Sequence, residues 1–190
     1  AFFKTMAKRY ADLDHVIYEI CNEPNGGTSW TQIKKYAKSV IKTIRTYDKN
    51  GIIIVGTPTW SQDVDQAAAS PITGYKNLMY AFHFYASDND HNRWLTSKIG
   101  TAISKGLPVF VSEFGLSQAD GNGNVDLTKA AEWMRRCDDY KVSYCVWSLS
   151  NDYRSSSLIK SSCSKTSGWS VDDLTTAGQY IRNHYRSKVE

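Results

Sequence analysis

Apolar positions along the chain follow two alternating patterns. Short runs that are apolar almost throughout alternate with longer stretches in which apolar residues recur every three or four positions. The first pattern is typical of strands covered on both faces, and the second of amphipathic helices. Their alternation predicts a parallel α/β fold. The predicted strands are residues 15–22, 51–57, 77–86, 107–115 and 142–150.

The helical stretches lie between these strands. The clearest begins after Ser29, whose hydroxyl can cap the helix while Gln32 completes a capping box, and it ends near Asn50. No linker, repeat or low-complexity tract interrupts the alternation, so we expect one domain over residues 1–190. The other predicted helical segments are residues 1–11, 94–103, 127–137 and 174–184.

Composition narrows the possible functions. The net charge is +4, but Lys and Arg are scattered rather than clustered, so we expect no nucleic-acid partner. No stretch of 18 apolar residues occurs, and we therefore expect no membrane span. The four cysteines lack C-x-x-C spacing, which argues against a zinc or redox site, and Cys21 and Cys145 read as small buried thiols.

The segment "DGNGN", residues 120–124, superficially resembles a calcium-binding loop. Position six of such a loop should be glycine and is Val125, and no glutamate stands at position twelve. A glycine-rich surface turn is the better interpretation. We expect neither a metal nor a cofactor.

Polar and aromatic residues gather where predicted strands end. Ligands of parallel α/β folds bind at the carboxyl ends of the strands, because the connecting loops meet there. The residues that the pattern places at these ends or in the adjoining loops are Asn22, Glu23, Trp60, His83, Tyr85, Glu113 and Trp147.

Glu23 and Glu113 form a candidate acid/base pair. Glycoside hydrolysis uses two carboxyl groups, one that protonates the leaving oxygen and one that attacks the sugar or activates water. Exposed aromatic faces suit sugar rings, which present C–H groups on one side. Taken alone, Glu23 is equally well interpreted as a solvated carboxylate at the end of a strand.

Several segments together resemble a known family. "VIYEICNEPNG", "IIIVGTPTWSQDVD", "MYAFHFYA", "VFVSEFGLSQADGNG" and "VWSLSN" follow one another as they do in glycoside hydrolase family 5. The chain is most similar to the C-terminal portion of the catalytic domain of bacterial-type endo-β-1,4-glucanases, or cellulases. The resemblance implies an α/β fold of the (β/α)8 TIM-barrel type, with strands 4 to 8 and their helices in this chain. It also implies a retaining, double-displacement mechanism on β-glucan.

The resemblance also implies a role for each site residue. Glu23 corresponds to the acid/base and Glu113 to the nucleophile, while Asn22 corresponds to the residue that binds the 2-hydroxyl of the sugar. The remaining positions match residues that orient the nucleophile and the sugar or that stack on sugar rings, namely His83, Tyr85, Trp147 and Trp60.

The chain departs from the family pattern at three places near its last two strands. Val146 stands where Asn is frequent, Phe114 where Trp is usual, and Asn151-Asp152 where Asp-Lys is common. The missing lysine puts binding of a distal sugar in doubt. Activity on mannan or another β-glycan stays open beside glucanase activity, because the features that select among sugars lie partly in the strands that this chain lacks. A catalytically incomplete half-barrel that at most binds glycans also stays open.

Residues 15–22 and 142–150 would form the two edges of a partial barrel. Proteins normally pair or cover such edges, so we expect a missing N-terminal segment or a second chain, including a second copy of this one, to complete the barrel. The chain starts with Ala1 in mid-pattern, which suggests processing or truncation at that end. Secretion is expected from the resemblance alone.

Overall fold

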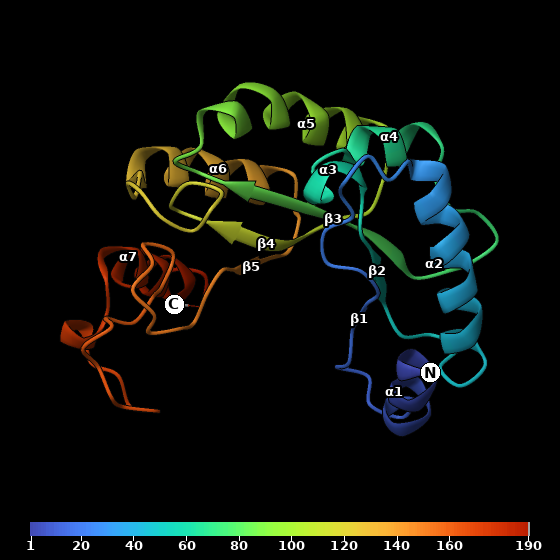
Figure 1. The fold of residues 1–190 in the computed structure, drawn as a ribbon, viewed down its shortest axis with the longest axis horizontal. Helices are drawn as coiled ribbons and strands as arrows, with labels where there is room; N and C mark the ends of the chain where they lie inside the picture. Colours follow the sequence, from blue (N-terminus) through green and yellow to red (C-terminus); the bar gives the residue numbers. More distant parts are fainter. Residues whose placement is uncertain (190) are drawn as a thin grey trace. The chain divides into compact units, whose positions relative to one another are not determined.

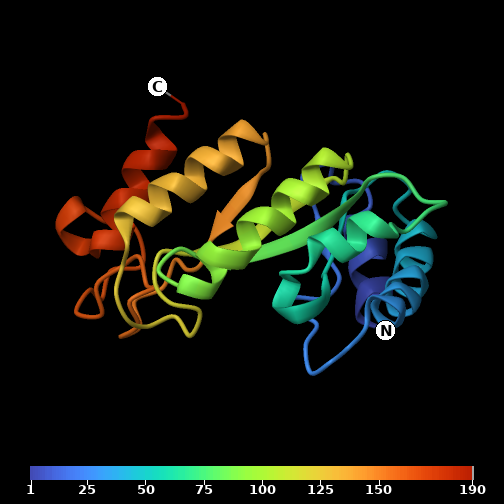
Figure 2. The same ribbon diagram turned by 90° about the horizontal axis from the view of Figure 1, so that it is seen from above.

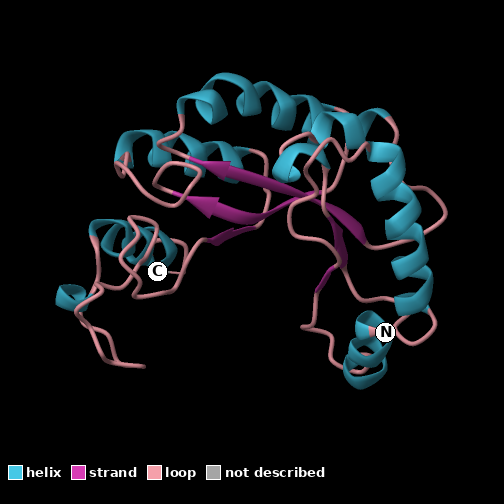
Figure 3. Ribbon diagram, in the orientation of Figure 1, coloured by secondary structure: helices cyan, strands magenta, loops and turns pink. Residues whose placement is uncertain are grey.

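The computed structural model describes residues 1–189 and contains the predicted alternation of strands and helices (Figure 3). One sheet has the strand order β1-β2-β3-β4-β5, so the strands neighbour one another in chain order. The pairs β1–β2, β2–β3 and β4–β5 are parallel. The strands are β1 (Tyr18–Glu19), β2 (Ile53–Val55), β3 (Leu78–Tyr85), β4 (Val109–Gly115) and β5 (Tyr144–Val146).

Each strand is followed by a helical segment, as Figure 1 shows. All the helical stretches predicted from the sequence are present. The α3 and α4 helices and the two short segments η1 and η2 were not predicted, because three to six residues are too few to show a helical period. The segments are α1 (Phe2–Tyr10), α2 (Trp30–Arg45), α3 (Pro58–Ser61), α4 (Val64–Ala69), the π-helical η1 (His91–Leu95), α5 (Thr96–Ser104), α6 (Leu127–Asp139), the 3₁₀ turn η2 (Val171–Asp173) and α7 (Thr176–Arg186).

The capping box predicted before α2 is confirmed. The Ser29 hydroxyl accepts a hydrogen bond from the Gln32 amide at 3.3 Å, and the Ser29 amide donates to the Gln32 side chain at 2.9 Å. These two bonds satisfy backbone groups that a helix start leaves unpaired. Helix α2 therefore begins at a residue that the sequence itself specifies.

Strands β1, β2 and β5 are shorter than their apolar runs. Residues 13–16 form a turn in which the Val16 amide donates to the Leu13 carbonyl at 3.0 Å, so pairing begins only at Tyr18. A segment forms a strand only where a neighbouring strand supplies backbone hydrogen-bond partners, and the apolar run in the sequence does not show where those partners end. The predictions of strands at 15–22, 51–57 and 142–150 were thus right in position and too long.

The described residues pack into two compact units. The first comprises Ala1–His83 and Leu95–Phe110, and the second comprises Phe84–Trp94 and the chain from Val111 onward. Within the first unit, α1 packs on α2 and α4 packs on α5 (Figure 2). Within the second unit, the Phe84 ring stacks between Trp133, with centroids 4.2 Å apart, and Phe114, at 5.4 Å. One domain over residues 1–190 stays a prediction.

Three burial predictions were wrong. Cys145 is exposed and Cys21 is only half-buried, although both were expected to be buried thiols. Cys145 lies on β5, which is last in the sheet order and has a described partner strand on one side only. Trp94 is the first residue of the helical segment predicted at residues 94–103, where we expected it on the apolar face, but it is 53% exposed, because residues 91–95 form a π-helical turn with a different period.

Within residues 1–189, none of the helices has both the length and the apolar character needed to cross a membrane.

Candidate active site

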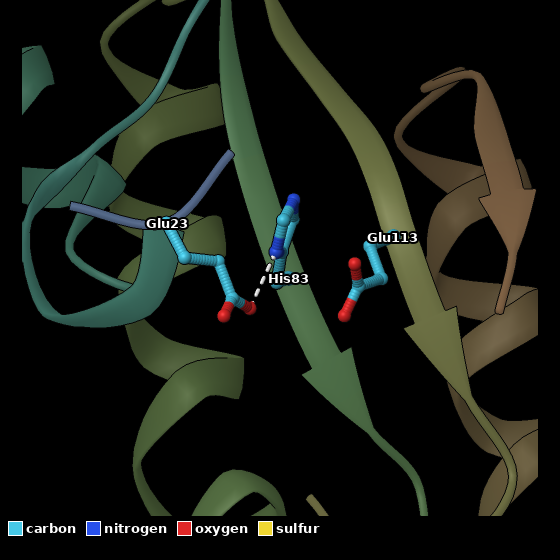
Figure 4. Close-up of side chains that lie close together, drawn as sticks. All are labelled: Glu23, His83 and Glu113. Atoms are coloured by element: carbon cyan, nitrogen blue, oxygen red, sulfur yellow. Dashed lines mark hydrogen bonds and ion pairs between the residues drawn. The ribbon is translucent and has the colours of Figure 1, made fainter. Parts of the chain in front are cut away.

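The first carboxylate, Glu23, follows β1 and contacts a histidine of β3. Its Oε1 lies 2.8 Å from Nδ1 of His83, as Figure 4 shows. His83 is 2% exposed, whereas the Glu23 side chain is 26% exposed. The imidazole nitrogen can donate to a carboxylate or accept from a carboxylic acid, so this contact suits either protonation state of Glu23.

The backbone on both sides of Glu23 is held by the segment after β2. The carbonyl of Asn22 accepts a hydrogen bond from the Ser61 hydroxyl at 2.7 Å, and the carbonyl of Pro24 accepts one from the Trp60 amide at 3.0 Å. Gly56 makes this approach possible, because a Cβ there would lie 2.6 Å from the Cys21 carbonyl oxygen. The Asn22–Pro24 segment is therefore fixed by its backbone, and Glu23 extends from a supported position.

The second carboxylate, Glu113, lies on β4 (Figure 4) and accepts a hydrogen bond from a tyrosine of β3. The Tyr85 hydroxyl donates to Glu113 Oε1 at 2.8 Å, and the Tyr85 amide donates to His91 Nδ1 at the same distance. A hydroxyl that donates to a carboxylate favours its ionised form. Glu113 thus has a partner suited to a carboxylate that must stay charged.

Strand β3 supplies the partners of both carboxylates. His83 and Tyr85 are two residues apart on this strand, and alternate residues of a strand point to the same face. The contacts to Glu23 and Glu113 therefore start from one face of one strand.

Trp60 stands in an unusual backbone turn. Thr59, Trp60 and Ser61 have φ angles of 57°, 55° and 58°, in the left-handed region. This conformation costs about 1–2 kcal/mol for each residue that carries a side chain. Trp60 was predicted to lie in a loop; it lies in α3, whose inner residues are not helical, and 49% of its surface is exposed.

Trp147 follows β5 directly and is held by its backbone. Its amide donates to the Phe114 carbonyl at 2.7 Å, while 46% of its surface stays exposed. The residues that replace the family's Asp-Lys stabilise the next loop. The Asn151 side chain donates to the Cys163 carbonyl at 2.9 Å, and the hydrogen bond from Ser157 is the main reason why the pKa of Asp152 is below its usual range.

Six of the seven predicted site residues lie near strand ends or in adjoining loops, and Trp60 lies in α3. The structure brings together the pairs Glu23–His83 and Glu113–Tyr85. Sequence reasoning missed the residues that support them: Gly56, Ser61, Asp63, His91 and Gly115. Their partners are distant in the sequence or lie in turns without an apolar period. For Gly56 and Gly115, the signal in the sequence was that each glycine stands at the end of a β-rich run.

Comparisons with known proteins agree with this architecture. The family described as cellulase, glycosyl hydrolase family 5, matches residues 1–153. The chain is 47% identical over 183 residues to an endoglucanase of Clostridium saccharobutylicum, covering 96% of this chain and 40% of that protein. It is 43% identical over 190 residues to endoglucanase A of Evansella cellulosilytica, covering 99% of this chain and 38% of the relative.

Solved structures show the same fold. A structure from Cytophaga hutchinsonii superposes with a TM-score of 0.94 at 42% identity, covering 98% of this chain and 60% of that one. The catalytic domain of Thermobifida fusca endoglucanase Cel5A, in complex with cellotetraose, gives 0.89 at 36% identity, covering 97% and 62%. The predicted partial (β/α)8 barrel is confirmed. The chain spans less than half of either curated relative described above.

Proposed function

Because the chain belongs to glycosyl hydrolase family 5, the cellulase family, we propose that the protein is an endo-acting hydrolase of β-1,4-glucosidic bonds that retains the anomeric configuration. One observation supports the chemistry above all others. Glu23 contacts His83 and Glu113 contacts Tyr85, so each carboxyl group that glycoside hydrolysis requires has a partner able to hold it for its step.

In the first half-reaction, a carboxylate oxygen of Glu113 attacks the anomeric carbon. The bond to the leaving oxygen breaks, and that oxygen takes the proton of the Glu23 carboxylic acid. The Tyr85 hydroxyl holds the attacking carboxylate in place, as its 2.8 Å hydrogen bond to Glu113 indicates.

In the second half-reaction, Glu23 is a carboxylate and accepts a proton from water. The water oxygen attacks the anomeric carbon of the glycosyl ester, and the electron pair of the broken bond returns to Glu113. His83 Nδ1 can stay in contact with Glu23 through both steps, because it can donate or accept.

We assign sugar binding to Asn22, Trp60 and Trp147. Both tryptophans expose about half of their surface although they are large and apolar, which is typical of aromatic side chains that contact a ligand. The similarity to an endoglucanase domain solved with cellotetraose supports a β-glucan chain as the ligand.

We further propose that more polypeptide completes the barrel, either an N-terminal segment of the same protein or a second chain. The observation behind this is that the chain matches about 60% of the solved structure from Cytophaga hutchinsonii. The mass of the native protein, together with light scattering, distinguishes a longer chain from a pair of chains. Secretion is part of the proposal by family resemblance and is tested by assaying the protein in culture supernatant.

The experiment measures sugar release by the intact protein from carboxymethyl cellulose and from mannan. We expect release from the glucan, with the β-anomer appearing first in proton NMR spectra of the products. Glu113→Gln should lower the rate at least about 10²-fold, because removal of a nucleophile is not compensated by neighbouring groups. Glu132→Gln changes an exposed glutamate of α6 and serves as the matched control.

Each alternative predicts a different result. Faster release from mannan would identify a mannanase of the same family, and α-anomer as the first product would exclude retention. No release from either polymer, together with retained oligosaccharide binding, would identify a catalytically incomplete glycan-binding protein.

A further inference from the structure

Asp63 is a nearly buried acid whose carboxylate faces the left-handed turn that carries Trp60. It is 8% exposed, and its Oδ2 accepts hydrogen bonds from the Thr59 hydroxyl at 2.8 Å and from the Gln66 side chain at 2.9 Å. Its Oδ1 forms an ion pair with Lys98 of α5. Both oxygens of the carboxylate are thus engaged by the described residues around the turn.

Asp63 stands at the start of α4, where its carboxylate would be expected to cap the helix. Asp63 precedes α4 at the N-cap, where an aspartate normally accepts a hydrogen bond from the first turn of the helix. Here its side chain makes no capping bond. The carboxylate is turned instead toward Thr59, the first of the three residues with a positive φ angle.

The turn needs such support because its own backbone disfavours it. Thr59, Trp60 and Ser61 all carry side chains in a conformation that glycine adopts more easily. Strained backbone of this kind persists only where the surroundings hold it, and it is concentrated at ligand sites. On one side the turn is held by the carbonyls of Asn22 and Pro24, and on the other by Asp63.

We propose that Asp63, charged and anchored by Lys98, is a positioning residue for Trp60. It holds the left-handed turn in place, so that the half-exposed indole is presented beside the Asn22–Pro24 segment as a preformed face for a sugar ring. This inference rests on the proposed function for the identity of the ligand. Asp63 does not contact the reacting atoms in this scheme and affects substrate binding only through Trp60.

The first test is spectroscopic and does not depend on activity. The intact protein is labelled with 5-fluorotryptophan, and the resonance of Trp60 is identified by its loss in Trp60→Phe. In Asp63→Asn we expect the ¹⁹F resonance of Trp60 to shift or broaden while the other tryptophan resonances stay in place. Asp65→Asn is the matched control, because Asp65 lies on α4 and its Oδ1 makes no hydrogen bond to the described residues.

The second test is a double-mutant cycle on a soluble β-glucan. We expect Asp63→Asn to raise KM about 3- to 10-fold with kcat nearly unchanged, as loss of one aromatic contact would. Trp60→Ala should raise KM by a similar factor, and adding Asp63→Asn to Trp60→Ala should have no further effect, because Asp63 acts through Trp60.

Additive effects on KM, or an unchanged Trp60 resonance in Asp63→Asn, would overturn the proposal. If Asp63→Asn fails to fold, Lys98→Met removes the charge partner, keeps the Thr59 contact and is measured in the same two ways. Lack of sugar release by the unmodified protein would refute the proposed function, whereas the NMR measurement would still decide whether Asp63 positions Trp60.

Discussion

The Tyr85 ring fills the space next to Gly115 that the side chain of any other residue at position 115 would occupy. A Cβ at position 115 would lie 2.4 Å from Cε1 of the Tyr85 ring. The same ring carries the hydroxyl that donates to Glu113. A single missing methyl group thus determines whether the hydroxyl of Tyr85 reaches the candidate nucleophile.

We expect Gly115→Ala to lower both activity and stability. The added methyl group displaces Tyr85, so kcat should fall about 10- to 100-fold as the hydroxyl moves away from Glu113. Crowding in a packed interior should lower the free energy of unfolding by about 1–3 kcal/mol. Urea denaturation and steady-state kinetics on carboxymethyl cellulose measure the two effects.

Tyr85→Phe is the comparison for this variant. It keeps the ring and removes the hydroxyl, so it should lower kcat with a smaller loss of stability than Gly115→Ala. An active Gly115→Ala enzyme with unchanged stability would show that the ring has room to move.

At the scale of elements, hydrogen bonds decide where a helix begins and which neighbouring segment it packs on. Helix α2 begins at a reciprocal capping box that is readable in the sequence. Helix α7 is held in a different way, because the Tyr144 hydroxyl of β5 lies 2.7 Å from His184 Nε2 and 3.3 Å from Asp138 Oδ1 of α6. The capping box of α2 is a local contact, whereas the contacts of Tyr144 with His184 and Asp138 are tertiary.

Ser29→Ala should lower the free energy of unfolding by about 1 kcal/mol, because the Gln32 amide loses its acceptor. Chemical denaturation measures the loss. Ser39→Ala changes an exposed serine in the middle of the same helix and should have little effect or a slightly stabilising one. Equal effects of the two substitutions would contradict a specific role for the cap.

The contact between His184 of α7 and Tyr144 of β5 predicts that the free energy of unfolding depends on pH. Burial lowers the pKa of His184 below its ordinary 6.5, and the charge of Lys188 lowers it further, while Asp138 opposes the shift. Since the unfolded chain then binds more protons, the free energy of unfolding should fall as pH drops below about 6.5, until His184 is also protonated in the folded protein.

Urea titrations at pH 7.5 and pH 5.5 measure this dependence. His184→Gln keeps a side chain able to bond to Tyr144 and should remove this part of the difference between the two pH values. Among the described residues, the groups around His184 that also carry charge or titrate are Asp138, Tyr144, Tyr180, Tyr185 and Lys188. An undiminished difference in His184→Gln would assign the effect to other groups.

For the whole molecule, the sheet order leaves β1 and β5 at its two ends. The matched solved structures extend well beyond the region that this chain covers, as the 60% and 62% coverage of two of them shows. Strand edges of a partial barrel are normally paired, and a substrate cleft needs a complete wall to hold a sugar chain.

We therefore expect the 190-residue chain produced alone to be much less active than the intact protein. Its rate on carboxymethyl cellulose should be lower by at least about 10²-fold, because catalysis depends on precise placement of substrate. Light scattering of both preparations controls for self-association. Equal rates per molecule, with the chain monomeric, would show that no further polypeptide is needed.

Much of this architecture was determined by the sequence. Hydrophobic periodicity predicted all five strands and the longer helices, because these elements bury apolar residues at fixed spacings. The Ser29 cap and the positions of Glu23 and Glu113 near strand ends were likewise local properties. Strand ends, by contrast, depend on which neighbours supply hydrogen bonds, so β1, β2 and β5 were predicted too long.

Only the tertiary structure decided how these residues are supported. Glu23 meets His83 across 60 positions, Asp63 meets Lys98 across 35, and Gly115 is required by the ring of Tyr85. Such contacts leave no period in the sequence, because they form between segments that the fold brings together. The sequence by itself therefore determined where the strands and helices lie and predicted which residues carry the candidate chemistry, while packing decided what contacts Glu23, Trp60 and Glu113.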